Sequence, residues 1–170
     1  INNSNINSFQ SVAAFNPKDS TQVQFKILDF ELINGKLNKN DIKTVIANYE
    51  SVVQNLRLIK KPEEDRWDNS NKNYIWSEVA LGEDSDGNML LIFSRSPYWM
   101  SDLNNILIDL PINIECAQHL EGGPEASLYL KYKTTELEFV GIYESTKDFY
   151  FNDIKNNYWE IPNIIGITKK

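Results

Sequence analysis

The chain has 170 residues, 41% of them hydrophobic and 12% aromatic, and its formal net charge is −7. This length and composition predict one globular domain over residues 1–170 with a single core, and no stretch is long and apolar enough to span a bilayer. The acidic balance disfavours nucleic acid and anionic membranes as partners through bulk electrostatics.

Cysteine and histidine each occur once, as Cys116 and His119. One cysteine excludes an internal disulfide and a cysteine-based metal cluster, and one histidine excludes a multi-histidine zinc site. We therefore expect no metal centre and no cofactor, although carboxylates alone could still bind Mg²⁺ or Ca²⁺. Cys116 lies in an apolar run, which predicts a buried core thiol rather than a nucleophile.

The first third of the chain alternates strand and helix patterns. Residues 1–10 are rich in Asn and Ser and are predicted to be disordered. Asn34-Gly35 is a turn signal. The helix expected at 41–48 would be capped by Asn40 or Asp41 and would bury Ile42, Val45 and Ile46. Strands are predicted at 11–15, 22–32 and 51–59.

The middle of the chain begins with a charged stretch, 60–73, which predicts a surface loop anchored by Trp67. Strands at 76–81 and 89–93 flank the acidic segment 83–88. That segment lacks the spacing of a calcium loop, and Asp86-Gly87 instead predicts a β-hairpin turn. Ser94-Arg95-Ser96-Pro97 is expected to leave the strand.

A helix is predicted at 102–109. Ser101 and Asp102 are expected to cap it, and Pro111 to end it. The apolar side chains that this helix would bury are Leu103, Ile106, Leu107 and Leu110.

Residues 115–130 are predicted to form two strands joined by an acidic glycine turn. Gly122 and Gly123 can adopt positive φ and present bare amides, and Pro124 fixes the exit direction. His119 and Glu121 lie at the end of the first strand. An acid, an imidazole and open amides at a strand end are typical of a ligand or catalytic site. The alternative is a tight hairpin turn with a solvated glutamate.

The last part of the chain predicts a strand at 136–143 and a closing strand at 161–167. The aromatic residues between them are predicted as core anchors rather than a base-stacking surface, because no basic residues interleave with them; they are Phe149, Tyr150, Phe151, Tyr158 and Trp159. Together these elements predict an α+β fold: a mixed, largely antiparallel twisted sheet with two or three short helices packed on it.

The order of Arg95, the helix at 102–109 and the run from Ala117 to Tyr129 resembles the phosphodiester glycosidase family, including its bacterial exported members. The hallmark of that family is a turn like Asn-Leu-Asp-Gly-Gly-Gly, followed by small hydroxyl residues and a strand. The positions that correspond to it here are His119, Glu121, Gly122, Gly123 and Ser127.

The resemblance covers roughly residues 50–132, and the segments 54–57 and 76–82 are similar to two further blocks of the family. Two positions depart from the pattern, because Glu121 replaces Asp and Pro124 replaces the third Gly. The family's N-terminal Asn-Ala-Gly-Met-Phe-like block is missing. The resemblance therefore implies the C-terminal part of a longer, exported protein.

The resemblance implies cleavage of a sugar phosphodiester at the glycosidic carbon, with a phosphate monoester as leaving group. Glu121 would act as general base or nucleophile, and His119 would shuttle a proton or orient the sugar. Arg95 and Arg57 would hold the phosphate charge with the amides of Gly122 and Gly123. Ser77 and Ser127 would complete the substrate contacts.

Other readings of the same residues stay open. Arg57 and Arg95 could be surface ion-pair partners, and His119 could be a hydrogen-bonded core residue. The chain could also be a catalytically inactive carbohydrate- or envelope-binding module of the same fold, with its aromatic tail as a sugar-stacking surface. A third possibility is a small acidic inhibitor steered by its charge to a basic partner.

Overall fold

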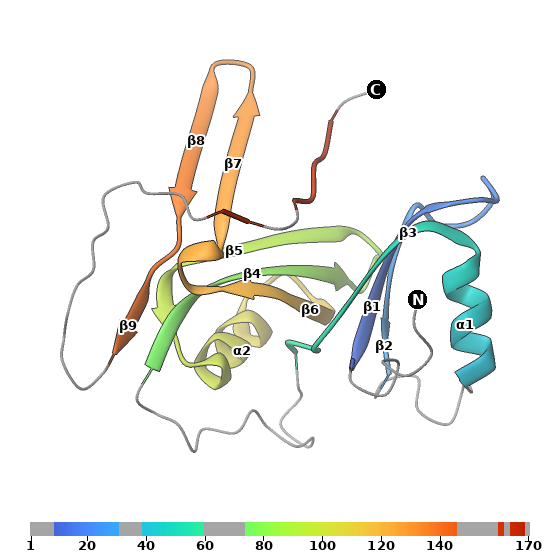
Figure 1. Cartoon of the computed structure of the whole chain (residues 1–170), viewed down its shortest axis with the longest axis horizontal. Coiled ribbons are helices and arrows are strands. Elements are labelled where there is room, and N and C mark those ends of the chain that lie inside the picture. The colour runs from blue at the N-terminus through green and yellow to red at the C-terminus, as the bar shows by residue number, and fades with distance from the viewer. Residues whose placement is uncertain (1–8, 31–38, 60–73, 146–159, 162–163, 169–170) are drawn as a thin grey trace.

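The computed structural model of the chain describes residues 9–30, 39–59, 74–145, 160–161 and 164–168. Within these ranges the strands pair antiparallel throughout, in three sheets, and two α-helices and one 3₁₀ turn accompany them (Figure 1). The predicted α+β class, mostly sheet, is confirmed. No helix in the described part is long and apolar enough to cross a membrane.

The first sheet contains β1 (Ser11–Pro17), β2 (Phe25–Asp29) and β3 (Tyr49–Asn55) in the order β2-β1-β3. The helix α1 (Lys39–Ala47) packs on it through Ile42 and Ile46, which contact Val12 and Leu28. These elements confirm the predicted strand at 11–15 and, within one or two residues, the predicted helix at 41–48. The strand predicted at 22–32 is confirmed for residues 25–29 only, since residues 22–24 form no strand and residues 31–32 lie outside the described part.

The second sheet has β4 (Tyr74–Asp84) at its centre, between β5 (Met89–Tyr98) and β6 (Ile114–Gly122). The short β9 (Tyr143–Ser145) pairs with the first residues of β4. One face of this sheet is covered by α2 (Met100–Asp109), whose Leu103 and Leu107 pack against Ala80 and Ala117 (Figure 1).

The start of α2 differs from the prediction. Because β5 continues through Ser94–Pro97 as far as Tyr98, the helix begins at Met100, and Trp99 is its N-cap without a side-chain cap. Four of the buried residues recur at i, i+3, i+4 and i+7, which defines a helical stripe; they are Met100, Leu103, Asn104 and Leu107. Ser101 beside them is also buried. Ile106 and Leu110 lie outside that stripe and are exposed, contrary to the prediction.

The predicted hairpin turn between β4 and β5 is confirmed. Gly87 has φ = +81°, and the carboxylate of Asp84 accepts hydrogen bonds from the backbone N–H of Asp86 and of Asn88. The acidic side chain is therefore used to hold the turn closed.

The two strands and the glycine turn predicted within residues 115–130 are present, but the strands do not pair with each other as a hairpin. β6 pairs with β4, whereas β7 (Ser127–Tyr132) pairs with β8 (Thr135–Val140). The intervening 3₁₀ turn η1 (Gly123–Glu125) is a corner that redirects the chain from the second sheet into the β7–β8 hairpin, which projects from the body (Figure 1). Pro124 at the start of this turn and φ = +70° at Gly123 set the change of direction.

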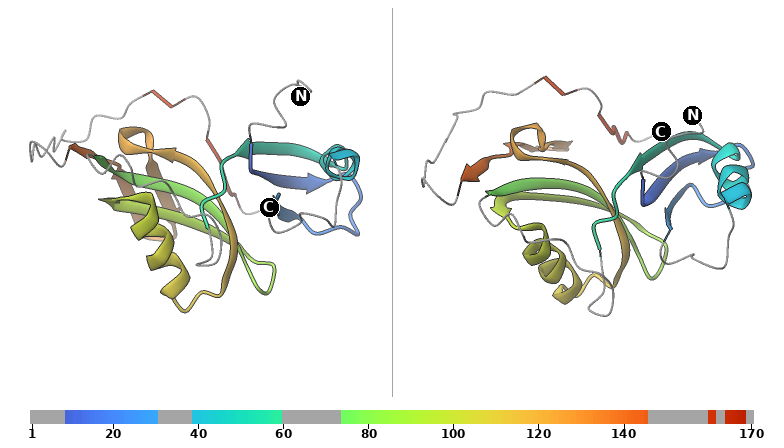
Figure 2. Two further views of the ribbon diagram at one scale, coloured as in Figure 1. Left: turned by 90° about the horizontal axis from the view of Figure 1, so that it is seen from below. Right: turned by 60° about the horizontal axis from the view of Figure 1, so that its bottom comes forward.

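The two main sheets are joined along β6. The residues after β3 continue beside β6, because Leu58 N–H donates to Ala117 O at 2.7 Å and His119 N–H donates to Leu56 O at 3.0 Å. The predicted strand at 51–59 is thus β3 plus this bridged extension. Figure 2 shows α1 and α2 at opposite ends of the molecule, with β6 and the extension between them.

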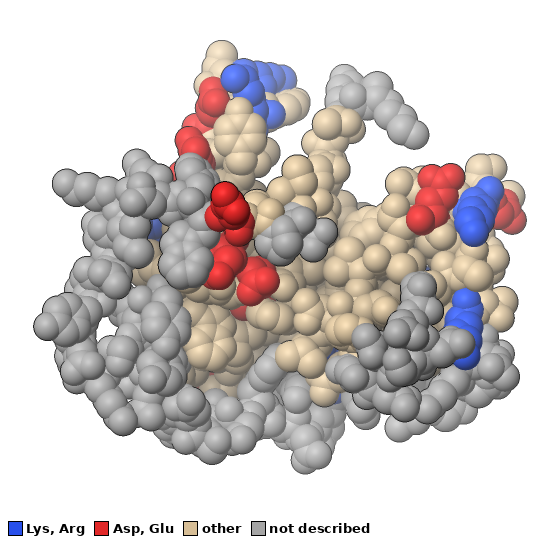
Figure 3. All heavy atoms as spheres, viewed as in Figure 1, with Lys and Arg blue, Asp and Glu red and all other residues tan. Residues whose placement is uncertain are grey.

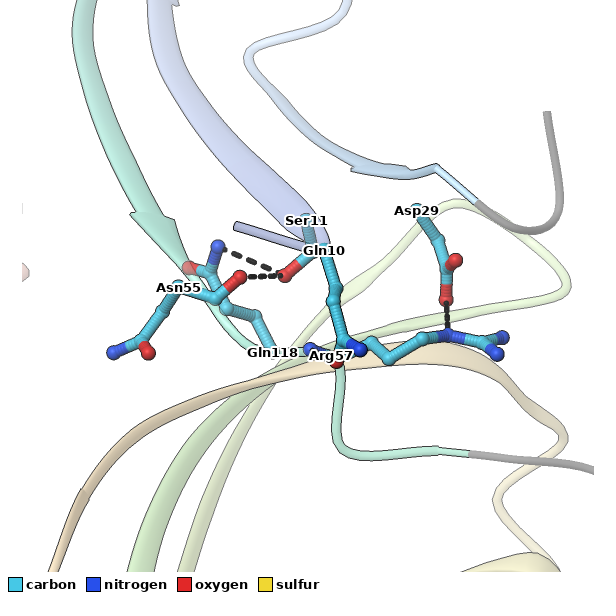
Figure 4. A network of polar contacts seen from close by, with 6 residues as sticks. All are labelled: Gln10, Ser11, Asp29, Asn55, Arg57 and Gln118. Atoms are coloured by element: carbon cyan, nitrogen blue, oxygen red, sulfur yellow. Dashed lines mark hydrogen bonds and ion pairs between the residues drawn. The ribbon is translucent and has the colours of Figure 1, made fainter. Parts of the chain in front are cut away.

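Polar groups are buried at this junction (Figure 4). Gln118 Nε2 donates to Ser11 Oγ at 3.1 Å, and Arg57 Nε lies 2.9 Å from Asp29 Oδ2. Beside them, Cys116 packs with Leu81 in a buried apolar cluster, as predicted for a core thiol. Burial, followed by the charges of nearby carboxylates, raises the pKa of Cys116 to about 12.

The C-terminal prediction fails where it can be checked. Residues 160–161 and 164–168 form no strand, and the isoleucines among them are exposed.

The predicted cap at Asn40 or Asp41 is wrong, because both residues lie inside α1, which already includes Lys39. Of the predicted disordered stretch 1–10, Gln10 is ordered by backbone hydrogen bonds with Asn55 and Phe30. The remaining predictions lie outside the described residues: disorder in residues 1–8, Asn34-Gly35, the loop 60–73 with Trp67, and the aromatic residues of 146–159.

Candidate functional site

Glu78 of β4 and His119 of β6 form a hydrogen-bonded pair on neighbouring strands. Glu78 Oε1 contacts His119 Nδ1. The Glu78 side chain has no solvent exposure, whereas the His119 side chain is 20% exposed. Glu78 Oε2 has no hydrogen-bond partner among the described residues. The pair therefore links a fully buried carboxyl to an imidazole that solvent can reach.

A β-bulge creates this arrangement. Ala80 lies opposite His119 but Val79 lies opposite Glu121, so Leu120 is an extra residue in β6. The bulge places Gly122, rather than Glu121, directly opposite Glu78. Two glutamate side chains directly opposite each other on neighbouring strands would repel. Because of the bulge, Glu121 lies opposite Val79 instead.

Burial dominates the chemistry of Glu78. Its pKa is raised to about 7, and desolvation by burial is the largest cause. The hydrogen bond and the charge of His119 lower the pKa, whereas the charge of Glu121 raises it. A carboxyl group with this pKa can hold a proton near neutral pH.

The pKa of His119 is also raised above its ordinary value. Burial is the largest influence and lowers it, but the hydrogen bond and charge of Glu78, together with the charge of Glu121, outweigh burial. Because both partners have raised pKa values and share one hydrogen bond, the pair as a unit retains a proton near neutral pH and releases it as pH rises.

Glu121 and Gly122 lie at the exposed end of this pair. Glu121 is exposed, and its Oε1 accepts the backbone N–H of Gly122 at 3.2 Å. Gly122 also packs against Trp76, because a Cβ at this position would lie 2.6 Å from the indole Cδ1. The lack of a side chain at Gly122 thus lets the Trp76 ring lie beside the site.

Ser77 has a structural role in the described structure. It is fully buried, its hydroxyl donates to Arg95 O at 2.5 Å, and it accepts the N–H of Ile142 at 2.7 Å. These two bonds tie β4 to β5 and to the chain before β9. The hydroxyl predicted to contact substrate is therefore not presented to solvent.

The other residues of the glycine motif divide between turn and surface. Gly123 is buried, and its carbonyl oxygen accepts the N–H of Ala126 at 3.1 Å within the corner. Ser127 is half-buried at the start of β7, opposite Val140. The Gly122 amide, predicted to be open to an anion, donates instead to the side chain of Glu121.

The two arginines are separated. Arg57 is buried in its ion pair with Asp29, on the side of β6 that faces the first sheet, and is not the surface group considered from the sequence. Burial of the guanidinium against a carboxylate removes it from the surface around Glu121. Arg95 is exposed on β5, with β4 between it and β6.

The described residues contain no group of three or more His, Cys, Asp or Glu side chains that could hold a metal ion.

Sequence reasoning identified His119 and Glu121 but missed Glu78. Glu78 belongs to the segment 76–82, in which no chemical role was assigned to it. The alternation of side chains along β4 could have indicated such a role. Residues 76, 78 and 80 lie on the same face of a strand, and Glu78 is the only charged residue among them. A carboxyl at such a position needs a partner, and the partner lies 41 residues away in sequence.

No protein-family model, curated protein or solved structure matches this chain.

Proposed function

We propose that this chain is a glycosidase-like hydrolase domain that cleaves sugar phosphodiesters at the glycosidic carbon. The observation that supports the proposal is a buried glutamate with a pKa of about 7, hydrogen-bonded to a partly exposed histidine and followed along β6 by an exposed carboxylate. Two carboxyl groups in contrasting environments are the usual basis for acid and base roles in glycoside hydrolysis.

In this proposal His119 is the group that meets the substrate, because it is the exposed member of the pair. It delivers a proton to the departing oxygen, and Glu78 holds the imidazole in place and replenishes the proton. Glu121 then activates water or attacks the anomeric carbon. The half-buried Trp76 beside Gly122 offers an apolar surface for the sugar ring.

Arg95 is the remaining candidate for the phosphate. A phosphate monoester departs readily once its charge is balanced, and a guanidinium group offers paired donors for its oxygens. Arg57 is buried in an ion pair with Asp29 and therefore stabilises the fold rather than contacting the substrate.

The burial of Arg57 favours a second candidate, a binding module that keeps the fold without turnover, because one of the two expected phosphate-binding groups is occupied. The acidic inhibitor has less support. In Figure 3 the acidic side chains of the visible face lie in separate groups, below the β7–β8 hairpin, along it and near α1, rather than in one concentrated surface.

The test is hydrolysis of N-acetylglucosamine phosphodiesters by the chain and by the variants Glu121→Gln and His119→Gln, with Glu50→Gln on the exposed edge of β3 as control. Loss of an acid or base group should lower kcat by about 10²- to 10⁴-fold, and the control should be unchanged. Arg95→Ala should raise KM. Equal rates in all variants would contradict the assignment, whereas saturable binding without turnover would favour the binding module.

A further inference from the structure

The β7–β8 hairpin is an amphipathic two-stranded ribbon. Its register pairs Leu128 with Phe139 and Leu130 with Leu137, and side chains alternate between the two faces of a strand. One face therefore consists of Leu128, Leu130, Tyr132, Thr135, Leu137 and Phe139, all apolar or aromatic except Thr135. The opposite face is polar and carries Lys131, Glu136 and Glu138, with the Tyr129 hydroxyl donating to Glu136 at 2.9 Å.

Only the base of the apolar face is covered. Phe139 stacks on Phe93 of β5 with ring centroids 6.0 Å apart. Farther out the apolar side chains are exposed: Leu130 by 45%, Tyr132 by 63% and Leu137 by 40%. An isolated two-stranded ribbon is marginally stable in water and needs further cover on its apolar side.

The area of this apolar face limits the kind of partner that can cover it. Six-residue strands are about 20 Å long, and two strands spaced by about 4.8 Å make a narrow ribbon. A stable interface between two folded proteins needs about 800 Å² per partner, several times the area of such a ribbon. The face therefore fits one extended segment rather than a second folded copy.

The same chain supplies a segment of matching chemistry. Ile161, Ile164, Ile165 and Ile167 are exposed by 39%, 79%, 40% and 58%, and the residues around them that the structure describes form no strand. If extended, residues 164–167 span about 13 Å and place Ile165 and Ile167 on one side. Figure 1 places the described C-terminal residues on the same side of the molecule as the hairpin.

We propose that residues 164–167 dock as an extended segment along the apolar face of the β7–β8 hairpin, with Ile165 and Ile167 against Leu130 and Leu137. The docked segment covers both sets of exposed apolar side chains at once. The inference is independent of the proposed hydrolase activity, because none of these residues belongs to the Glu78–His119 site.

Disulfide trapping in the whole 170-residue chain tests this contact, with Cys116→Ala as background. Leu137→Cys/Ile165→Cys places both thiols in the proposed contact. Glu138→Cys/Ile165→Cys moves one thiol to the adjacent residue on the polar face and serves as the matched control. Under mild oxidation the first pair should lose both free thiols as a monomer, about tenfold faster than the control pair.

Equal rates in the two pairs, or no disulfide in either, would overturn the proposal. A cross-linked dimer formed by the Leu137→Cys pair would also overturn it, in favour of a second copy as occupant. Because the substituted side chains at 137, 138 and 165 are all exposed, the variants are expected to fold, and circular dichroism checks this.

Discussion

At the residue scale, Glu78 places a carboxyl group at a buried position, where an apolar side chain such as leucine would carry a smaller desolvation penalty. Glu78 has no solvent exposure, and its only described side-chain partner is His119. Burying a carboxyl with one oxygen unpaired is costly, and the raised pKa is the consequence, since the neutral form is less penalised. Such a position is retained more readily for chemistry than for stability.

The pair makes stability depend on pH. The pKa of Glu78 is about 7 in the folded chain against an ordinary 4.5, so the folded state binds the proton more tightly. The free energy of unfolding should therefore fall as pH rises from about 5 to about 8, by at most about 3 kcal/mol. The raised pKa of His119 acts in the same direction, because its contribution is present below 6.5 and is lost above the folded pKa.

Urea unfolding at a series of pH values measures this dependence. Glu78→Gln keeps the shape of the side chain but removes the titration, so its stability should vary less over the same range. A wild-type curve parallel to that of Glu78→Gln would contradict the expected linkage.

At the scale of elements, the corner between β6 and β7 is held by close backbone contact. A Cβ on Gly141 would lie 2.2 Å from Gly123 O and 2.7 Å from Ala126 O, and Gly141 N–H donates to Ala126 O at 2.6 Å. Gly141→Ala should therefore lower the free energy of unfolding by about 3 kcal/mol.

Gly166→Ala is the control for this substitution, because nothing lies within 4 Å of a Cβ built there. Thermal unfolding should place the control near the wild type. A Gly141→Ala protein as stable as the control would show that the corner can relax around the extra methyl group.

The elements that sequence reasoning recovered are those with local causes. Asp86-Gly87 specified the β4–β5 turn, and the spacing of Leu103 and Leu107 with Pro111 specified most of α2. The error at 115–130 has a different origin. Glycine and proline mark a change of direction, but they carry no information on which strands pair across it. β6 pairs with β4, and that choice depends on residues far along the chain.

The site shows the same limit. His119 and Glu121 are two residues apart and were found together, whereas Glu78 joins them only through the β4–β6 pairing. Arg57 was predicted to contact phosphate or to lie in a surface ion pair, and it is buried instead. Its partner Asp29 lies on β2, 28 residues away in sequence, so nothing close to Arg57 in the chain indicates the pair.

At the scale of the whole molecule, the junction between the two main sheets contains a buried ion pair. The side chains of Arg57 and Asp29 are 4% and 2% exposed, and they lie 2.9 Å apart between β2 and the extension of β3 (Figure 4). Arg57→Leu should lower the free energy of unfolding by about 3–5 kcal/mol, because the buried carboxylate of Asp29 then loses the guanidinium charge beside it.

The double variant Arg57→Leu/Asp29→Leu removes both charges and should recover much of this loss in chemical denaturation. Lys131→Met, which breaks the exposed ion pair with Glu136, is the control and should cost far less because water screens that pair. Additive losses from the two junction substitutions would contradict a direct coupling between Arg57 and Asp29.

The most direct test of the central claim, that Glu78 and His119 share a proton near neutral pH, is an NMR titration of the imidazole. His119 is the single histidine of the chain, so its ring signal needs no assignment. We predict a midpoint above 6.5 in the wild type and a lower one in Glu78→Gln, where burial becomes the dominant influence on the pKa. The same midpoint in both proteins would contradict the pairing and, with it, the proposed proton-transfer role.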